Sequence, residues 1–183
     1  MQTKALLTAV EFLQTGPETD HCELVRGEVV PMPPPAKGHG AVCANVVYRL
    51  TAYTKQIGHG STMCNDTGIM TQHDPDTVRG ADVMLFLHPS WEGQSIPEGY
   101  SDEPADLVVE VRSPSQSWTD VVKKVGEYLA IGCRLVWVID PHRKRVTVFS
   151  PEQEPATFAP ENDLDGGAVL PGFRCRVSEL LDG

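Results

Sequence analysis

Three segments of the chain are predicted to form helices, and in the longest of them apolar residues recur at helical spacing. The longest is 39–57, where one side of a helix would carry Val42, Val46, Val47, Leu50, Tyr53 and Ile57. Gly58 follows it and predicts the C-terminal end of this helix. A short helix is expected to begin at Thr8, which has capping-box spacing to Glu11, and a third is expected at about 119–131.

Short apolar runs bounded by turn-forming residues predict β-strands. Two pairs of runs predict hairpins, Cys22–Arg26 with Glu28–Met32 and Leu135–Ile139 with Arg145–Phe149. Further strands are expected within Thr67–Thr71, Ala81–Leu87 and Ala105–Arg112, with a closing strand between Phe173 and Leu181. The segment 88–104 is expected to be a long surface loop. This order of helices and strands predicts an α/β or α+β domain in which helices pack on a sheet.

The composition predicts one globular domain over residues 1–183. With 183 residues, 40% of them hydrophobic, the chain can bury a sizeable core. No apolar run reaches the roughly 18 residues of a membrane span, and Lys4 and Glu11 interrupt the apolar start of the chain. We therefore expect a cytoplasmic protein with neither a membrane span nor a signal peptide.

Several common functional signatures are missing. The five cysteines lie at least 21 residues apart, which predicts buried free thiols and disfavours a disulfide framework or a CxxC zinc site. The phosphate-binding loops GxGxxG and GxxxxGK[ST] and the hydrolase motif GxSxG are absent. No metal-ligand spacing such as HExxH links the histidines His21, His59, His73, His88 and His142.

A carboxylate inside an apolar run is the first candidate for chemistry. Glu110 lies within 106–112, a run expected to form a central strand buried on both faces. Burying a carboxylate is costly unless it is paired or bound to a cation, so Glu110 needs a partner. Asp82, expected at the beginning of another apolar strand, is the natural candidate. Two adjacent strands would bring both carboxylates to one edge, where a hard cation such as Mg²⁺ takes oxygen ligands.

Two basic residues are placed to complete such a site. Arg112 follows Glu110 by two positions and would share its face of the strand. Lys124 lies on the next helix, on one face with Asp120 and Tyr128. A cation beside a metal-bound phosphate can stabilise negative charge or orient the attacking water, and we favour Lys124 because a lysine can shift its pKa.

The chain carries an ordered series of motifs that resembles a known family. The motifs are ELVRGEVV at 23–30, MPPP at 32–35 with His39, RGADV at 79–83, DLVVEVRSPS at 106–115, Asp120 with Lys124 and Tyr128, and VWVIDP at 136–141. Together they resemble the Uma2 family of restriction-endonuclease-like proteins, over roughly residues 5–181. The resemblance implies the PD-(D/E)xK nuclease fold, a mixed central sheet flanked by helices. It also implies that the lysine of the E-x-K strand has moved to the next helix.

The resemblance assigns roles to individual residues. Asp82 and Glu110 match the metal-binding carboxylates, and the backbone carbonyl of Val111 would be a third ligand. Lys124 matches the migrated lysine. Glu23 matches an acidic residue that lies near the metal in related nucleases. The implied cofactor is Mg²⁺, with Mn²⁺ as a substitute.

Other positions are less completely assigned. Ala81 stands where this fold often has Pro, and Arg112 occupies the E-x-K lysine place, where it could supplement Lys124 or pair with a nearby acid. Arg112, His39 and Tyr128 are candidate substrate contacts. Structural roles stay open for His39 at the start of a helix and for Tyr128 in packing.

The interpretation of the charged residues also leaves alternatives. Lys124 could form a helical ion pair with Asp120, which is worth only about 0.3–0.5 kcal/mol on an exposed face. Glu23 could pair with Arg26 or Arg49. The leading hypothesis is Mg²⁺-dependent hydrolysis of DNA phosphodiester bonds. The alternative is a non-catalytic module that binds nucleic acid or protein on a nuclease scaffold.

The net charge of −10 qualifies the expected DNA binding. It is unevenly distributed, because residues 112–145 hold seven basic and three acidic residues, a balance of +4, and the rest of the chain carries −14. We therefore expect weak, salt-sensitive and metal-dependent DNA binding on one face. A homodimer is also expected, since nucleases that cut both strands often act as symmetric pairs.

Overall fold

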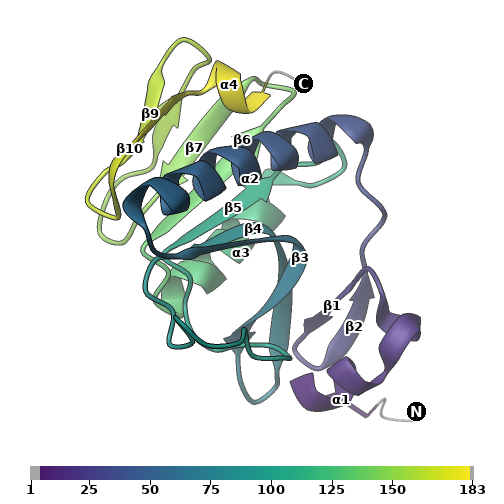
Figure 1. The fold of residues 1–183 in the computed structure, drawn as a ribbon. Helices are drawn as coiled ribbons and strands as arrows, with labels where there is room; N and C mark the ends of the chain where they lie inside the picture. Colours follow the sequence, from purple (N-terminus) through teal and green to yellow (C-terminus); the bar gives the residue numbers. More distant parts are fainter. Residues whose placement is uncertain (1–4, 182–183) are drawn as a thin grey trace.

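The computed structural model describes residues 5–181 and shows a main sheet with helices on both faces (Figure 1). The helices are α1 (Ala9–Gln14), the 3-10 helix η1 (Gly16–Thr19), α2 (Lys37–Ile57), α3 (Trp118–Ala130) and α4 (Ser178–Leu181). The strands are β1 (Cys22–Val25), β2 (Glu28–Pro31), β3 (Ser61–Gln72), β4 (Thr77–Phe86), β5 (Leu107–Val111), β6 (Leu135–Asp140), β7 (Arg145–Phe149), β8 (Ala156–Phe158), β9 (Asp163–Gly166) and β10 (Leu170–Arg176). Among these residues no helix is long and apolar enough to cross a membrane.

The main sheet is mixed, as expected. Its strands follow the order β2-β1-β4-β5-β6-β7-β8, with β3 paired to β4, and β9 and β10 form a separate hairpin. All neighbouring pairs are antiparallel except β5 and β6, which are parallel. A parallel pair needs a crossover connection, and α3 supplies it. The predicted fold class, a mixed sheet flanked by helices, is confirmed.

Two apolar layers cover the central strands. On one face α2 packs its buried residues, such as Leu50, against Val83 and Val109. On the other face α3 packs Val125 against alternate residues of the same strands, such as Met84. The β9–β10 hairpin and α4 lie beside α2 and extend the first layer (Figure 1). β5 is thus buried on both faces, as its apolar run predicts.

Several boundaries differ from the prediction. β3 begins at Ser61 and is longer than expected, because pairing with β4 carries it through a bulge in which Asn65 and Asp66 have positive φ. β4 begins at Thr77, before the predicted start at Ala81. The short strands β8 and β9 were not predicted. The expectation of buried thiols is wrong for Cys64, which is exposed, while Cys133 and Cys175 are buried.

Candidate active site

The sheet opens along one edge of β4. β3 pairs with one edge of β4 over nearly the whole length of β4. β1 and β5 therefore both pair with the other edge of β4. β1 pairs near the start of β4 and β5 near its end, which leaves residues 79–82 between them. Side-chain carboxylates fill this gap: Gly80 donates its N–H to Glu23 (3.2 Å), and Val111 donates its N–H to Asp82 (2.6 Å). The opening in the backbone ladder therefore places carboxylates in the middle of the sheet.

Asp82 and Glu110 face each other on adjacent antiparallel strands. Val83 pairs with Val109, and one residue further along the same register Asp82 lies opposite Glu110. Both are buried, with 9% and 5% of their surface exposed. The expected pairing of these carboxylates on neighbouring strands is present. The expected position of Asp82 at the beginning of its strand is wrong, because β4 begins at Thr77 and holds Asp82 in its interior.

Helix α3 brings a cation and a phenol to these carboxylates. Lys124 Nζ lies 2.8 Å from Glu23 Oε1 and 3.5 Å from Glu110 Oε2. Tyr128, one helical turn further on, donates its hydroxyl to Glu110 Oε1 at 2.6 Å. Lys124 does not form the alternative pair with Asp120, whose backbone and side chain bond to the residue that caps α3.

The buried charges of this cluster support one another. Burial raises the pKa of the Glu110 carboxyl, and the positive charge of Lys124 opposes that rise. Burial alone would lower the pKa of Lys124, but the carboxylates of Glu110 and Glu23 outweigh it and raise that pKa. Lys124 therefore stays protonated and holds a fixed positive charge next to two carboxylates.

A buried ion-pair network holds Glu23 in position. Arg79 on β4 donates to Glu23 Oε2 at 2.8 Å and, through two other N–H groups, to both oxygens of Glu127 on α3 at 2.6 and 2.9 Å. The alternative in which Glu23 pairs with Arg26 or Arg49 is wrong, because its ion pairs are with Arg79 and Lys124, and Arg49 pairs with Glu179 on α4. Arg79 thereby ties the β1–β2 hairpin to α3 across the opening in the sheet.

Asp82, Glu110 and Lys124 border a cavity of about 360 Å³. Its charged and metal-ligating residue types are His21, His39, Asp66, Asp82, Glu110 and Lys124, and Val111 also lines it. The segments 33–35 and 113–116 also line the cavity. Asp66 reaches it from the β3 bulge, and burial, followed by the charge of Asp82, raises the pKa of its carboxyl. The cavity therefore joins the carboxylate cluster to the surface.

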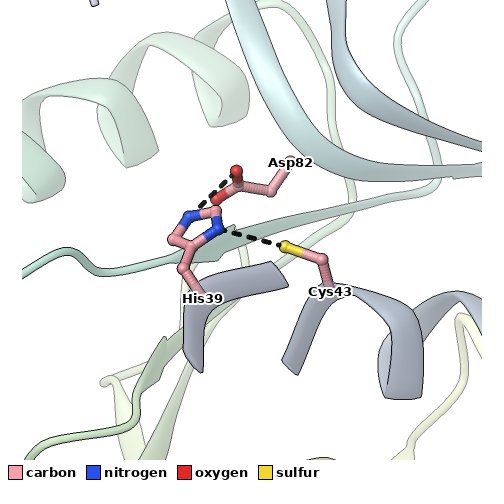
Figure 2. Close-up of side chains that lie close together, drawn as sticks. All are labelled: His39, Cys43 and Asp82. Atoms are coloured by element: carbon pink, nitrogen blue, oxygen red, sulfur yellow. Dashed lines mark hydrogen bonds and ion pairs between the residues drawn. The ribbon is translucent and has the colours of Figure 1, made fainter. Parts of the chain in front are cut away.

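His39 contacts Asp82 from the first turn of α2 (Figure 2). Its Nε2 lies 3.2 Å from Asp82 Oδ1, and its Nδ1 lies 3.5 Å from Cys43 Sγ. The hydrogen bond to Asp82 and then that to Cys43 raise the pKa of His39 to about 10, against the effect of burial. The expected helix start is corrected slightly, because α2 begins at Lys37. His39 thus adds a cationic side chain to the candidate metal-binding carboxylate.

Comparison with known proteins identifies the family. A family model described as "Uma2: Putative restriction endonuclease" matches residues 9–178. The chain belongs to the Uma2 family. A crystal structure of "a putative nuclease belonging to DUF820" from Anabaena variabilis ATCC 29413 is similar, with a TM-score of 0.81 and 24% sequence identity over 96% of this chain and 97% of that chain. At this identity the likeness shows a shared fold. No curated protein matches.

Two positions at which this Uma2 protein departs from the expected pattern have defined surroundings. Arg112 pairs with Asp140 at 2.8 Å and donates to the carbonyl of Gln116, also at 2.8 Å. It therefore has the nearby acid that the sequence left as one alternative, and it shapes the turn beside the cavity. Ala81 is fully buried within β4.

The sequence of this Uma2 protein gave no sign that Cys43 could be a metal ligand, or that His59, His88 and Glu92 lie together. His59 and His88 stack with ring centroids 4.3 Å apart, and His88 Nδ1 lies 3.6 Å from Glu92. Ligand atoms of these three residues lie within 4.8 Å of one another. Only the tertiary fold brings them together, because His59 follows α2 and the other two follow β4.

The Arg79 network gives a prediction about stability. Replacing Arg79 by Ala is expected to lower the free energy of unfolding by about 3–5 kcal/mol, because the partly buried Glu127 loses its cation and the buried Glu23 keeps only Lys124. Urea denaturation of the purified variant measures this. The control is Arg49→Ala, which breaks the more exposed pair with Glu179 and should cost about 0–1 kcal/mol. Equal losses in the two variants would contradict the prediction.

Proposed function

We propose that this Uma2 protein is an endonuclease that hydrolyses DNA phosphodiester bonds with the help of Mg²⁺. The supporting observation is the pair Asp82 and Glu110, opposed on adjacent strands at a cavity, with the protonated Lys124 beside them. The family description points to the same class of activity. We further propose that the protein works in the cytoplasm as a homodimer, in which two sites cut the two strands.

The donor atoms at this position suit a hard divalent cation. Asp82 and Glu110 offer carboxylate oxygens, and Val111, whose backbone carbonyl we propose as the third ligand, lines the same cavity. Oxygen ligands of this kind favour Mg²⁺ or Mn²⁺ over softer ions. When bound, such an ion supplies Lewis acidity, which polarises the phosphate and makes a water molecule more acidic. We propose these three residues as its protein ligands.

The surrounding side chains supply positioning and fixed charge. Lys124 presents an ammonium group that would stabilise the negative charge developing on the phosphate. Glu23 holds that ammonium at 2.8 Å and is itself held by Arg79. Tyr128 fixes the orientation of Glu110 through its hydroxyl. We therefore propose that Glu23, Arg79 and Tyr128 position the groups that touch the substrate.

Basic residues beyond the sheet edge support a DNA substrate. β5 and β6 run parallel, so the turn after β6 lies at the same edge as the residues after β5 that line the cavity. Arg143 and Lys144 in that turn are exposed. Arg112 and Asp140 join the two segments through their ion pair. A phosphate backbone entering the cavity would pass this basic rim, although the chain carries a net charge of −10.

One observation favours the non-catalytic alternative. Both oxygens of Asp82 already have partners, Val111 N–H and His39, and both oxygens of Glu110 have Tyr128 and Lys124. Such a closed network could serve structure alone. The two functions differ in their metal binding, because a nuclease must exchange some of these contacts for a divalent ion.

Plasmid cleavage with and without metal tests the proposal. The wild-type protein is expected to nick and linearise supercoiled DNA in Mg²⁺ or Mn²⁺, to lose that activity in EDTA, and to recover it when Mg²⁺ is restored in excess. Single-stranded and branched DNA are tested in parallel. Calorimetric titration with Mg²⁺ accompanies the assay. No cleavage of any substrate, together with no heat of Mg²⁺ binding, would support the binding module instead.

A further inference from the structure

Cys43 has no part in the proposed nuclease chemistry, yet its thiol lies beside the candidate metal site. His39 and Cys43 are four residues apart at the start of α2, so they share one face of the helix. That face meets Asp82 on β4, and the imidazole stands between the thiol and the carboxylate (Figure 2). One nitrogen, one sulfur and one carboxylate oxygen from these residues all lie within 4.8 Å of one another.

This donor set differs in kind from that of the proposed Mg²⁺ site. Mg²⁺ takes oxygen ligands, whereas Zn²⁺ and Co²⁺ bind thiolate, imidazole and carboxylate together. Two such ligands around one tetrahedral Zn²⁺ ion lie about 3.5 Å apart, from typical Zn–S and Zn–N bond lengths of about 2.3 and 2.0 Å. The present contacts of 3.5 Å at Cys43 and 3.2 Å at Asp82 involve the two different ring nitrogens, Nδ1 and Nε2. With one atom per residue the three ligand atoms lie within 4.8 Å of one another, so small side-chain movements would bring them to this spacing. An ion would take a single ring nitrogen and replace the two present contacts of His39.

The surroundings allow such an ion to enter. The side chains of His39 and Asp82 keep 14% and 10% of their surface exposed and line the cavity. Cys43 is half-buried, in contrast to the fully buried Cys133. Asp66 lies close enough for its charge to act on Cys43, and it also lines the cavity. His39 and Asp82 therefore connect this donor group to the cavity, and Asp66 adds negative charge beside it.

We propose that His39, Cys43 and Asp82 form a binding site for a borderline transition-metal ion, of which Zn²⁺ is the representative. The site shares Asp82 with the proposed Mg²⁺ site. Its three protein ligands leave a position open toward the cavity, as in zinc sites that exchange their fourth ligand. Metal binding here rests on the geometry of these residues alone.

The consequence for cleavage rests on the proposed nuclease function. A carboxylate drawn onto Zn²⁺ together with His39 and Cys43 is no longer available to hold Mg²⁺ opposite Glu110. Zn²⁺ therefore acts as an inhibitor that competes with Mg²⁺ at this centre. The thiol makes the inhibition selective for borderline ions, because harder ions such as Ca²⁺ do not take sulfur.

Cobalt binding tests the site independently of any nuclease activity. Co²⁺ is added to the reduced wild-type protein, and thiolate ligation is expected to give a charge-transfer absorption in the near ultraviolet that equimolar Zn²⁺ abolishes. Cys43→Ser is expected to lose this band and to bind Zn²⁺ more than about 100-fold more weakly, since loss of even a supporting residue costs about 10–100-fold. The matched control is Cys64→Ser, which removes an exposed thiol and should keep the band. Circular dichroism checks that both variants fold.

A cleavage assay then tests the inhibitory consequence. In Mg²⁺, the Zn²⁺ concentration that halves plasmid cleavage is expected to rise at least about 10-fold in Cys43→Ser relative to the wild type. Absence of the cobalt band in the wild type, or its persistence in Cys43→Ser, overturns the metal site. If the band behaves as expected but no metal supports cleavage, the nuclease proposal fails and the transition-metal site stands. If the cobalt band behaves as expected but Zn²⁺ inhibits cleavage by Cys43→Ser as strongly as cleavage by the wild type, competition between Zn²⁺ and Mg²⁺ through this site is overturned.

Discussion

Replacing Asp82 by Asn or Glu110 by Gln is expected to reduce Mg²⁺-dependent cleavage more than about 10³-fold. Each change removes a negative charge from the proposed ligand set, and a bound divalent ion contributes several kcal/mol of transition-state stabilisation, with each 1.36 kcal/mol worth a factor of ten. The amide side chains keep the shape of the originals. Asn can still accept the Val111 N–H, and Gln can still accept the Tyr128 hydroxyl. The fold is therefore expected to survive both changes.

Cleavage of supercoiled plasmid and calorimetric Mg²⁺ titration measure the effect of each substitution. Glu154→Gln is the control, because this exposed residue between β7 and β8 loses the same charge outside the site. The control is expected to cleave DNA and bind Mg²⁺ like the wild type. Undiminished cleavage by both site variants would remove Asp82 and Glu110 from the mechanism, whatever the metal requirement of the wild type.

The predictable parts of this fold carry strong local patterns. α2 has a continuous apolar side and ends at Gly58, whose φ of 82° suits glycine. β5 is an almost unbroken apolar run because both of its faces are covered. Glu110 stands out within that run for a physical reason: a carboxylate there needs a partner. The same argument identifies Asp82 as the candidate partner of Glu110, since the apolar runs of β4 and β5 both indicate buried strands.

The remaining parts depend on contacts between distant segments. The first half of β3 is held by pairing with β4, and its bulge brings Asp66 to the cavity even though polar residues break the strand pattern. The short strands β8 and β9 likewise owe their conformation to their partners. Local sequence patterns are therefore weakest where the sheet borders the site or closes the fold.

Partners of the site residues were harder to predict than the residues themselves. Arg79 is a charged residue in a buried strand, so the reasoning used for Glu110 could have singled it out. Its two partners come from β1 and α3, and only the fold shows that both reach it. The spacing of His39 and Cys43 on one helical face is visible in the sequence. That this face meets Asp82 depends on the packing of α2 against the sheet.

Replacing Lys124 by Ala is expected to separate catalysis from metal binding. Cleavage at saturating Mg²⁺ should fall by about 10²–10³-fold, the usual cost of losing one group that stabilises transition-state charge. Mg²⁺ affinity should rise, because Lys124 now neutralises Glu110 and Glu23 at 3.5 and 2.8 Å, and its removal leaves their charge to attract a cation. Without metal the variant should be less stable by about 3–5 kcal/mol, and Mg²⁺ should restore part of that stability.

Lys123 provides a matched control for this separation. It is the neighbouring lysine on α3 but is exposed, so Lys123→Ala removes the same charge without touching the buried carboxylates. It should therefore leave Mg²⁺ affinity, stability and cleavage close to those of the wild type. Weaker Mg²⁺ binding in Lys124→Ala would show that the lysine supports the metal site and does not compete with it. Full cleavage by Lys124→Ala would exclude this ammonium group as the charge that stabilises the transition state, and would leave it only the structural role of pairing Glu23 with Glu110.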